Sequence, residues 1–173
     1  MNLILKATQF AALKHCDQRR KDGKTPYIIH PISVAMILAE IGSIEDLEIL
    51  SAALLHDTIE DTDTSTHELD KEFGSRVRII VEELTDNNQL TFSQRKQMQI
   101  DNAPHLSKDA TLVKIADKIS NVSDVIKTHP PEWDQKRCTE YVDSSEEVIN
   151  NCQKVNQNLE NYFFELLTKY RKS

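Results

Sequence analysis

The scarcity of turn-forming residues constrains the fold of this chain more than any other feature of its sequence. Its 173 residues include only three glycines and five prolines. These two residue types mark most tight turns, so a fold made of many short strands is disfavoured. Apolar residues recur instead at helical spacing, and the chain length suits one domain. The sequence therefore predicts an all-α fold in which residues 1–173 form a single domain, a helical bundle whose helices from about residue 134 pack on the same core.

The expected helices follow from apolar spacing and from start and stop signals. They span residues 3–14, 31–40, 44–59, 65–74, 75–84, 92–102 and 107–127, with one or two more over 134–170. Ser43 resembles the N-terminal cap of the helix over 44–59, and Pro31 favours the first position of the helix over 31–40. Residues 75–84 also have the composition of a strand, but their apolar side chains fall at i, i+3, i+4 and i+7, which favours a helix.

Composition and charge exclude several classes of partner and compartment. The net charge of −7 argues against nucleic acid or an anionic membrane as a bulk partner. No apolar run approaches the roughly 18–20 residues of a membrane span, and the first residues lack the features of a signal peptide. Three cysteines without a CxxC pair argue against a disulfide framework and a zinc ribbon, and favour a reducing compartment. A cytoplasmic (or nuclear) protein is expected, and the sequence leaves monomer and homodimer open.

The segment 52–61 carries the clearest chemical signal. An apolar, helix-favouring stretch runs directly into His56, Asp57, Glu60 and Asp61. If the segment is one helix, these four side chains are i,i+3 and i,i+4 neighbours and share one patch at its end. Burying a carboxylate beside a core is costly unless the carboxylate is paired or coordinated. That cost is a first indication of a metal site.

Two further residues complete a candidate ligand set, which consists of His30, His56, Asp57 and Asp117. Two neutral imidazoles and two carboxylates suit a divalent ion such as Mn, Fe, Zn or Mg. Adjacent residues on a helix diverge by roughly 100 degrees, so His56 and Asp57 can hold one ion only at a helix end or with the ion between them. The loop before Pro31 and the helix that carries Asp117 must therefore supply the remaining ligands.

Three strings in this order resemble a known family. They read RKDGKTPYIIHP over residues 20–31, ALLHDTIEDT over 53–62 and LVKIADKISN over 112–121. Together they resemble the hydrolase domain of the RelA/SpoT alarmone enzymes, within the HD phosphohydrolase superfamily. The resemblance covers nearly the whole chain and is nearest to the stand-alone, hydrolase-only form of animals, the metazoan SpoT homologues. It implies a helical HD-domain bundle that removes pyrophosphate from the 3′ position of ppGpp or pppGpp.

The resemblance also assigns roles to residues. It implies one Mn²⁺ ion, rather than Zn²⁺, Fe²⁺ or Mg²⁺, held by His30, His56, Asp57 and Asp117. It implies that the attacking water is positioned and deprotonated by Glu60 and Asp61. The chemistry is consistent, because a divalent ion lowers the pKa of bound water and a nearby carboxylate can accept the proton. It implies that the small-molecule nucleotide substrate is bound by Arg20, Lys21, Asn121, Arg137 and Tyr141.

Two positions depart from the family pattern, and they leave the substrate open. Ser123 stands where the family commonly carries arginine, and Phe92 stands where close relatives carry lysine. Both changes remove positive charge near the expected pocket. Animal members are also linked to removal of the 2′-phosphate of NADPH, so an NADPH 2′-phosphatase or another nucleotide phosphohydrolase is an alternative. A non-catalytic nucleotide sensor is a further alternative, although a pure binder has no need of the Glu60 and Asp61 pair.

Overall fold

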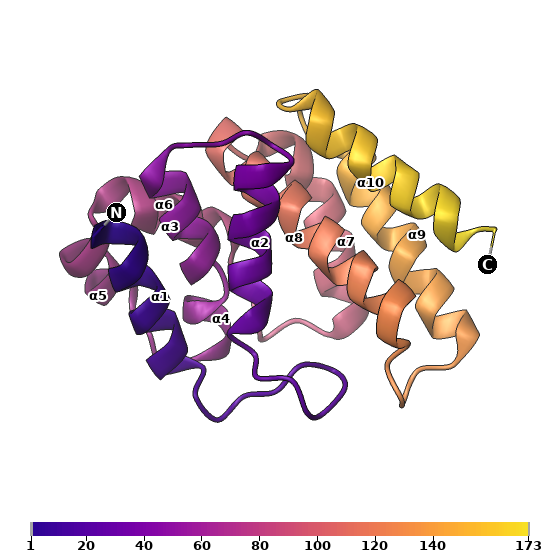
Figure 1. The fold of residues 1–173 in the computed structure, drawn as a ribbon, viewed down its shortest axis with the longest axis horizontal. Coiled ribbons are helices and arrows are strands. Elements are labelled where there is room, and N and C mark those ends of the chain that lie inside the picture. The colour runs from indigo at the N-terminus through magenta and orange to yellow at the C-terminus, as the bar shows by residue number, and fades with distance from the viewer. Residues whose placement is uncertain (1, 173) are drawn as a thin grey trace.

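The computed structural model describes residues 2–172, and helices account for its regular structure (Figure 1). The helices are α1 (Asn2–Lys14), α2 (Ile29–Glu40), α3 (Leu47–Leu55), α4 (Thr58–Asp61), α5 (Thr66–Phe73), α6 (Ser75–Leu84), α7 (Phe92–Asn102), α8 (Lys108–Thr128), α9 (Gln135–Asn151) and α10 (Gln157–Tyr170), with a short 3-10 helix η1 (Ala103–His105). No strand occurs within residues 2–172, so the predicted all-α fold is confirmed. None of the helices described is both long and apolar enough to cross a lipid bilayer.

Helix α8 is the centre of the bundle. It packs against α2, α3, α6, α9 and α10, and Figure 1 shows α9 and α10 running along one side of the molecule. On α8, the apolar side chains of Ile115, Ile119 and Val122 are fully buried. Side chains of the last two helices, such as Val142 and Phe163, belong to the same cluster of buried residues as those of α3 and α8. Residues presented by α8 toward α2 and α3 therefore lie deep in the molecule.

Several helices begin and end where local signals predict. The hydroxyls of Ser65 and Ser107 accept backbone N–H groups at the starts of α5 and α8, as expected of N-terminal caps. Helices α6 and α7 have the predicted bounds. The segment 134–170 forms two helices, and Asp134 caps the first of them. No disulfide links the described cysteines, of which Cys16 is exposed and the other two are buried.

The predicted single helix over 44–59 is wrong at both ends. Asp46 rather than Ser43 is the N-terminal cap, because its carboxylate accepts the N–H groups of Glu48 and Ile49. The helix then stops at Leu55, and α4 begins only at Thr58. The Thr58 hydroxyl donates to the Leu55 carbonyl at 2.6 Å. This bond satisfies a carbonyl of the last turn of α3 and lets the chain change direction there.

Helix α2 begins two residues earlier than predicted. The backbone N–H groups of Ile29 and His30 donate to Pro26 and Tyr27, which places His30 in the first turn of α2 rather than in the loop before it. Pro31 follows within the same turn, where its missing N–H costs nothing. The loop predicted before Pro31 is present and spans residues 15–28, and it arches below the bundle in Figure 1.

Candidate active site

Two histidines and two aspartates from three parts of the fold meet inside the bundle. The His30 Nε2 atom, on α2, lies 3.1 Å from Asp117 Oδ1 of α8 and 3.6 Å from Asp57 Oδ2. The His56 Nε2 atom lies 3.0 Å from Asp57 Oδ2 and 3.7 Å from Asp117 Oδ1. Ligand atoms about 2.0–2.2 Å from one ion lie roughly 3–3.5 Å apart at tetrahedral or octahedral angles. The ligand atoms of His30, His56 and Asp117 all lie within 4.8 Å of one another, a spacing that fits one divalent cation, and Asp57 lies beside both histidines.

The His56 ring supplies an independent test of that fit. Its Nδ1 atom lies 2.7 Å from the Ala53 carbonyl oxygen, so Nδ1 carries a proton and donates it. Its buried Nε2 atom faces the carboxylates of Asp57 and Asp117, at 3.0 and 3.7 Å, without a hydrogen bond of good geometry to either. A metal-binding histidine commonly donates its other N–H to a carbonyl in this way. The donor set and an Nε2 atom that faces two carboxylates both suit a bound metal ion.

The charges in the cluster favour a cation at its centre. Burial opposes ionisation of Asp57 and Asp117, but the neighbouring imidazoles outweigh burial and hold the pKa of both carboxyls below the usual range. Burial lowers the pKa of His30. For His56 the effect of burial is outweighed by Asp57 and Asp117, which raise its pKa. The two carboxylates thus draw a positive charge toward His56 Nε2, and a proton or a metal ion can supply it.

Tyr27 supports this cluster, although the sequence analysis gave it no role. Its hydroxyl donates to Asp57 Oδ2 at 2.7 Å and lies 3.2 Å from Asp61 Oδ2. Burial, together with these two carboxylates, raises the pKa of Tyr27, so its hydroxyl stays a donor. The residue was detectable, because it lies three positions before His30 in the first of the three strings.

The predicted catalytic pair lies beside the cluster, on α4. The Glu60 side chain is 18% exposed, and its Oε2 atom accepts the backbone N–H of Asp86 at 3.0 Å. Burial raises the pKa of Glu60 to about 7. Burial, with Asp57 nearby, also raises the pKa of Asp61. A carboxyl that titrates near neutral pH is suited to accept a proton from water.

A cavity of about 330 Å³ opens over the ligand cluster. Its basic lining residues are Arg19, Arg20, Lys21, Arg95, Lys96, Lys114 and Lys118. Of these, Lys114 and Lys118 are buried on α8, and Lys118 donates to Gln99 at 2.8 Å. Neither lysine was predicted as a site residue, although two lysines four residues apart within the string that carries Asp117 are a usable signal. The lining also includes five acidic residues, Asp57, Glu60, Asp61, Asp86 and Asp117, so basic residues outnumber acidic ones in a chain whose net charge is −7. This local excess of positive charge suits an anionic ligand.

Arg20 and Asn121 connect the cavity wall to the ligand cluster. The Arg20 side chain, 9% exposed, donates through Nε and Nη2 to Asp124 Oδ2. Its Nη2 atom also donates to Asn121 Oδ1 at 2.9 Å. Asn121 in turn donates to Asp117 Oδ1 at 2.6 Å. This chain of bonds fixes the Arg20 guanidinium beside a predicted metal ligand.

The other predicted substrate residues lie in different surroundings. Lys21 and Tyr141 line the cavity, whereas Arg137 is exposed and does not. Phe92 lines the cavity and is 56% exposed. Ser123 is half-buried and lines neither cavity. The two departures from the family pattern therefore differ, because only Phe92 lies where a ligand in the cavity can reach it.

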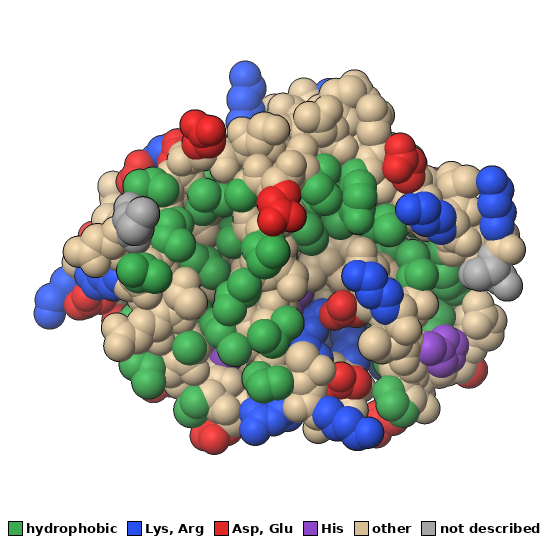
Figure 2. All heavy atoms as spheres, in the orientation of Figure 1, with side chains coloured by type: hydrophobic (Ala, Val, Ile, Leu, Met, Phe, Trp, Pro, Cys, Tyr) green, Lys and Arg blue, Asp and Glu red, His purple; other side chains and the backbone are tan. Residues whose placement is uncertain are grey.

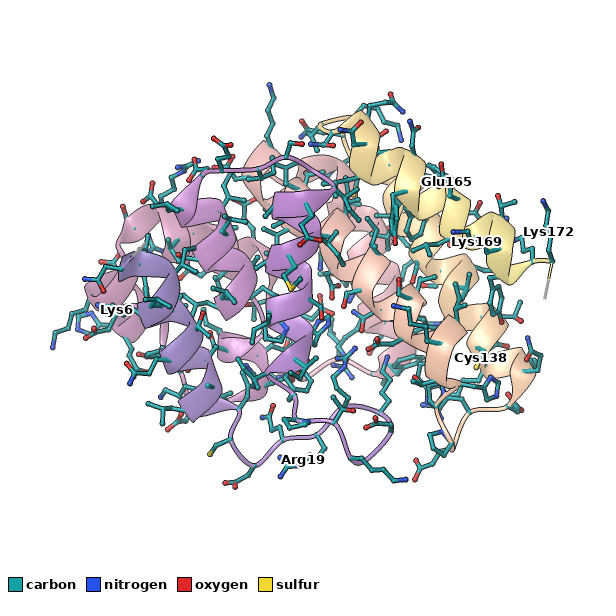
Figure 3. The ribbon with its side chains drawn as sticks, in the orientation of Figure 1. Lys6, Arg19, Cys138, Glu165, Lys169 and Lys172 are labelled. Carbon is teal, nitrogen blue, oxygen red and sulfur yellow. The ribbon has the colours of Figure 1, made fainter. Side chains whose placement is uncertain are left out.

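A second cavity, of about 90 Å³, lies between α2 and α8 next to the loop over 15–28. Figure 2 shows a hollow between these elements with Lys and Arg side chains inside it. Arg20, Lys21, His30 and Asn121 line both cavities. By contrast Arg19, labelled in Figure 3, lies on the outer part of the loop and donates to loop carbonyls.

Comparison with known proteins identifies the family. A family model described as an HD domain matches residues 7–144. The chain belongs to the HD domain family. Two relatives carry the name guanosine-3′,5′-bis(diphosphate) 3′-pyrophosphohydrolase MESH1. The Xenopus tropicalis protein is 49% identical over 91% of this chain and 89% of its own length, and the human protein is 48% identical over 91% and 88%.

A solved structure extends the likeness to the whole fold. It is described as a metazoan ortholog of SpoT that hydrolyzes ppGpp and plays a role in starvation responses. The two structures agree with a TM-score of 0.95 at 40% sequence identity, over 98% of this chain and 96% of the other. The resemblance to the HD superfamily and to the metazoan SpoT homologues is therefore confirmed.

Proposed function

We propose that this chain is a metal-dependent hydrolase that removes the 3′-pyrophosphate of ppGpp and releases GDP and pyrophosphate. The observation that carries the proposal is the His and Asp cluster under a cavity lined by basic side chains, with Glu60 beside it. Two relatives close to half identical in sequence carry the name of this activity, and a protein of nearly the same fold is described as hydrolysing ppGpp. The two alternatives, an NADPH 2′-phosphatase and a nucleotide sensor, have no comparable support.

We propose Mn²⁺ as the ion, held by His30, His56, Asp57 and Asp117. Two imidazoles and two carboxylates suit a divalent ion of intermediate softness. A bound ion of this kind lowers the pKa of a water molecule and offsets negative charge on the phosphoryl oxygens. Because Ser120 lies 3.1 Å from His30 Nδ1 and the Ala53 carbonyl 2.7 Å from His56 Nδ1, both rings are oriented with Nε2 toward the cluster.

The proton from the attacking water goes to Glu60 in this proposal. With a pKa of about 7, Glu60 is partly ionised at neutral pH, and its carboxylate is a stronger base than that of an ordinary glutamate. Asp61 orients the water. The Tyr27 hydroxyl contacts both Asp57 and Asp61 and so holds the two carboxylates in place relative to each other. In-line attack on phosphorus depends on such positioning and on charge stabilisation more than on covalent chemistry.

Substrate binding in this proposal relies on Arg20, Lys21, Asn121, Arg137 and Tyr141. The guanidinium and ammonium groups neutralise phosphate charge, and the asparagine and tyrosine contact the nucleoside. ppGpp carries phosphates at both the 3′ and 5′ positions, which fits a cavity with basic groups on several walls. The free thiols suit a reducing compartment, so we also propose a cytoplasmic location.

The test is release of pyrophosphate from ppGpp and of phosphate from NADPH, measured side by side with Mn²⁺ and with EDTA. We expect pyrophosphate from ppGpp, lost in EDTA and in His56→Ala. The matched control is His67→Ala, because His67 is an exposed histidine on α5. Phosphate from NADPH with no cleavage of ppGpp would move the function to dinucleotides. Binding of both nucleotides without turnover would favour the sensor.

A further inference from the structure

A stack of alternating cations and aromatic rings joins the loop over 15–28 to the start of α9. The Lys21 Nζ atom lies 4.6 Å from the centre of the Trp133 ring and 4.4 Å from the centre of the Tyr141 ring. The Arg137 guanidinium carbon lies 4.8 Å from the Trp133 ring. The two ring centres are 5.3 Å apart. Each cation is within the distance at which a ring attracts it.

Trp133 is the member of this stack that touches both cations. It lies in the connection between α8 and α9, near the start of α9, where Figure 3 labels Cys138. Its backbone N–H donates to the Pro130 carbonyl at 2.9 Å, which fixes the turn that presents the ring. Trp133 is half-buried and is not among the residues that line the main cavity, whereas Lys21 and Tyr141 are. Trp133 therefore influences a ligand in the cavity through its neighbours.

The surroundings of Lys21 make it dependent on those rings. The residue belongs to an outer loop and is exposed as a whole. Its ammonium, however, contacts both rings, and burial, with Arg20 next to it, lowers the pKa of Lys21 to about 8. A lysine has many rotamers, so without the rings its ammonium is free to leave the cavity wall. A partly dehydrated ammonium held in place is a better partner for phosphate than a mobile, hydrated one.

We propose that Trp133 is a positioning residue for substrate binding, whose ring holds the Lys21 ammonium at the cavity wall and also contacts the Arg137 guanidinium. The stack then presents two cations of fixed spacing to the phosphates of a nucleotide polyphosphate. This also gives the exposed Arg137 a defined place next to the substrate site. The inference rests on the proposed function only in taking a nucleotide polyphosphate as the ligand.

Trp133 is the one tryptophan in the chain, so its fluorescence reports on the stack directly. We would titrate the metal-free protein with ppGpp, follow tryptophan fluorescence and confirm the dissociation constant by calorimetry. In the Mn²⁺-loaded protein we would measure KM and kcat. The variants are Trp133→Leu, Trp133→Phe, Lys21→Ala and the Lys21→Ala/Trp133→Leu double variant. Tyr162→Leu, a half-buried aromatic on α10, is the matched control.

Trp133→Leu is expected to weaken ppGpp binding about fivefold, the size of one cation–π contact. KM should rise with it while kcat changes less than about twofold, because the ring does not touch the reacting atoms. Trp133→Phe should keep most of the affinity. In the Lys21→Ala background, Trp133→Leu should add less than its effect in the parent chain, which a general loss of structure would not do.

Two results overturn the inference. One is unchanged ppGpp affinity in Trp133→Leu, and the other is full additivity of the two substitutions. Neither bears on hydrolysis, which is measured separately in the parent chain. Conversely, a Lys21-dependent fluorescence change with no ppGpp cleavage would refute the proposed function and keep the role of Trp133.

Discussion

The most quantitative prediction concerns Glu60, because the structure shows both the contacts that hold its carboxylate and the burial that raises its pKa. Its carboxylate accepts the Asp86 N–H at 3.0 Å and lies 3.7 Å from the Arg95 guanidinium. Burial raises its pKa to about 7. Glu60→Gln keeps the side-chain length and an oxygen that can accept from Asp86, but it cannot take a proton from water. The substitution therefore isolates general-base chemistry from packing.

The expected size of the effect follows from these numbers. With a pKa of about 7, roughly a tenth of Glu60 is ionised at pH 6 and nine-tenths at pH 8. The rate in the parent chain should rise about tenfold across that interval, unless the bound cation moves the rise to lower pH by favouring the carboxylate. Glu60→Gln should lower kcat by about 10²–10⁴, or about 2.7–5.4 kcal/mol in activation free energy, and remove this limb of the profile.

The raised pKa of Glu60 also predicts how stability depends on pH. As pH rises, the rate should increase while the stability that Glu60 contributes is lost. The folded chain raises the pKa of Glu60 from 4.5 to about 7, so it binds this proton more tightly than the unfolded chain does. The stability that Glu60 contributes is present below pH 4.5 and is lost as pH rises through about 7. The Glu60→Gln variant does not lose this stability as pH rises, because glutamine does not ionise. In the metal-free protein it should therefore raise Tm relative to the parent chain above pH 7, with the difference shrinking at lower pH.

The assay is a pH profile of kcat for ppGpp between pH 5.5 and 8.5 with saturating Mn²⁺, together with Tm of the metal-free protein over the same range. Glu165→Gln is the control, since Glu165 is exposed on α10, where Figure 3 labels it. A Glu60→Gln variant that keeps the parent rate and the parent profile would refute the assignment of Glu60 as base. Equal Tm values above pH 7 would refute the argument from burial.

Three further predictions address the ligand cluster and the cavity wall. His56→Ala should lose bound metal as well as activity, measured by elemental analysis of the purified protein; full metal content would contradict its place as a ligand. Arg20→Lys should raise KM about tenfold, because lysine cannot reproduce the forked contacts to Asp124 and Asn121; an unchanged KM would show that the fork is dispensable. Phe92→Lys should lower KM at low salt and lose that advantage as salt rises, whereas Met98→Lys on the same helix should not, since Met98 is exposed outside the cavity.

Local signals account for the parts of the fold that were predictable. The bounds of α6 and α7, and the cap of α8 by Ser107, depend on spacing and on side chains a few residues apart. The start of α3 was misplaced because Ser43 and Asp46 are both acceptable caps by composition. Ser43 instead has a φ of 54°, a left-handed conformation that takes it out of the helix start.

The candidate site also has a part that the sequence predicts, the ligand cluster, and a part that it does not, the supporting contacts. The motif strings predict His30, His56, Asp57 and Asp117 as ligands. The structure brings the ligand atoms of His30, His56 and Asp117 within 4.8 Å of one another and places Asp57 beside the two histidines. The supporting contacts come from tertiary structure and leave no local pattern. Lys21 meets the ring of Trp133 only because the loop over 15–28 lies beside the connection between α8 and α9. A sequence pattern cannot report a contact between residues more than a hundred positions apart.

The break after α3 explains how two adjacent residues can serve one ion. In an unbroken helix, His56 and Asp57 would point roughly 100 degrees apart. The chain leaves helical geometry at these two residues, and His56 Nε2 and Asp57 Oδ2 come to lie 3.0 Å apart. The hydroxyl of Thr58 and the ring of His56 hold the break by bonding to the Leu55 and Ala53 carbonyls. The feature that the helical prediction missed is thus the one that lets the cluster form.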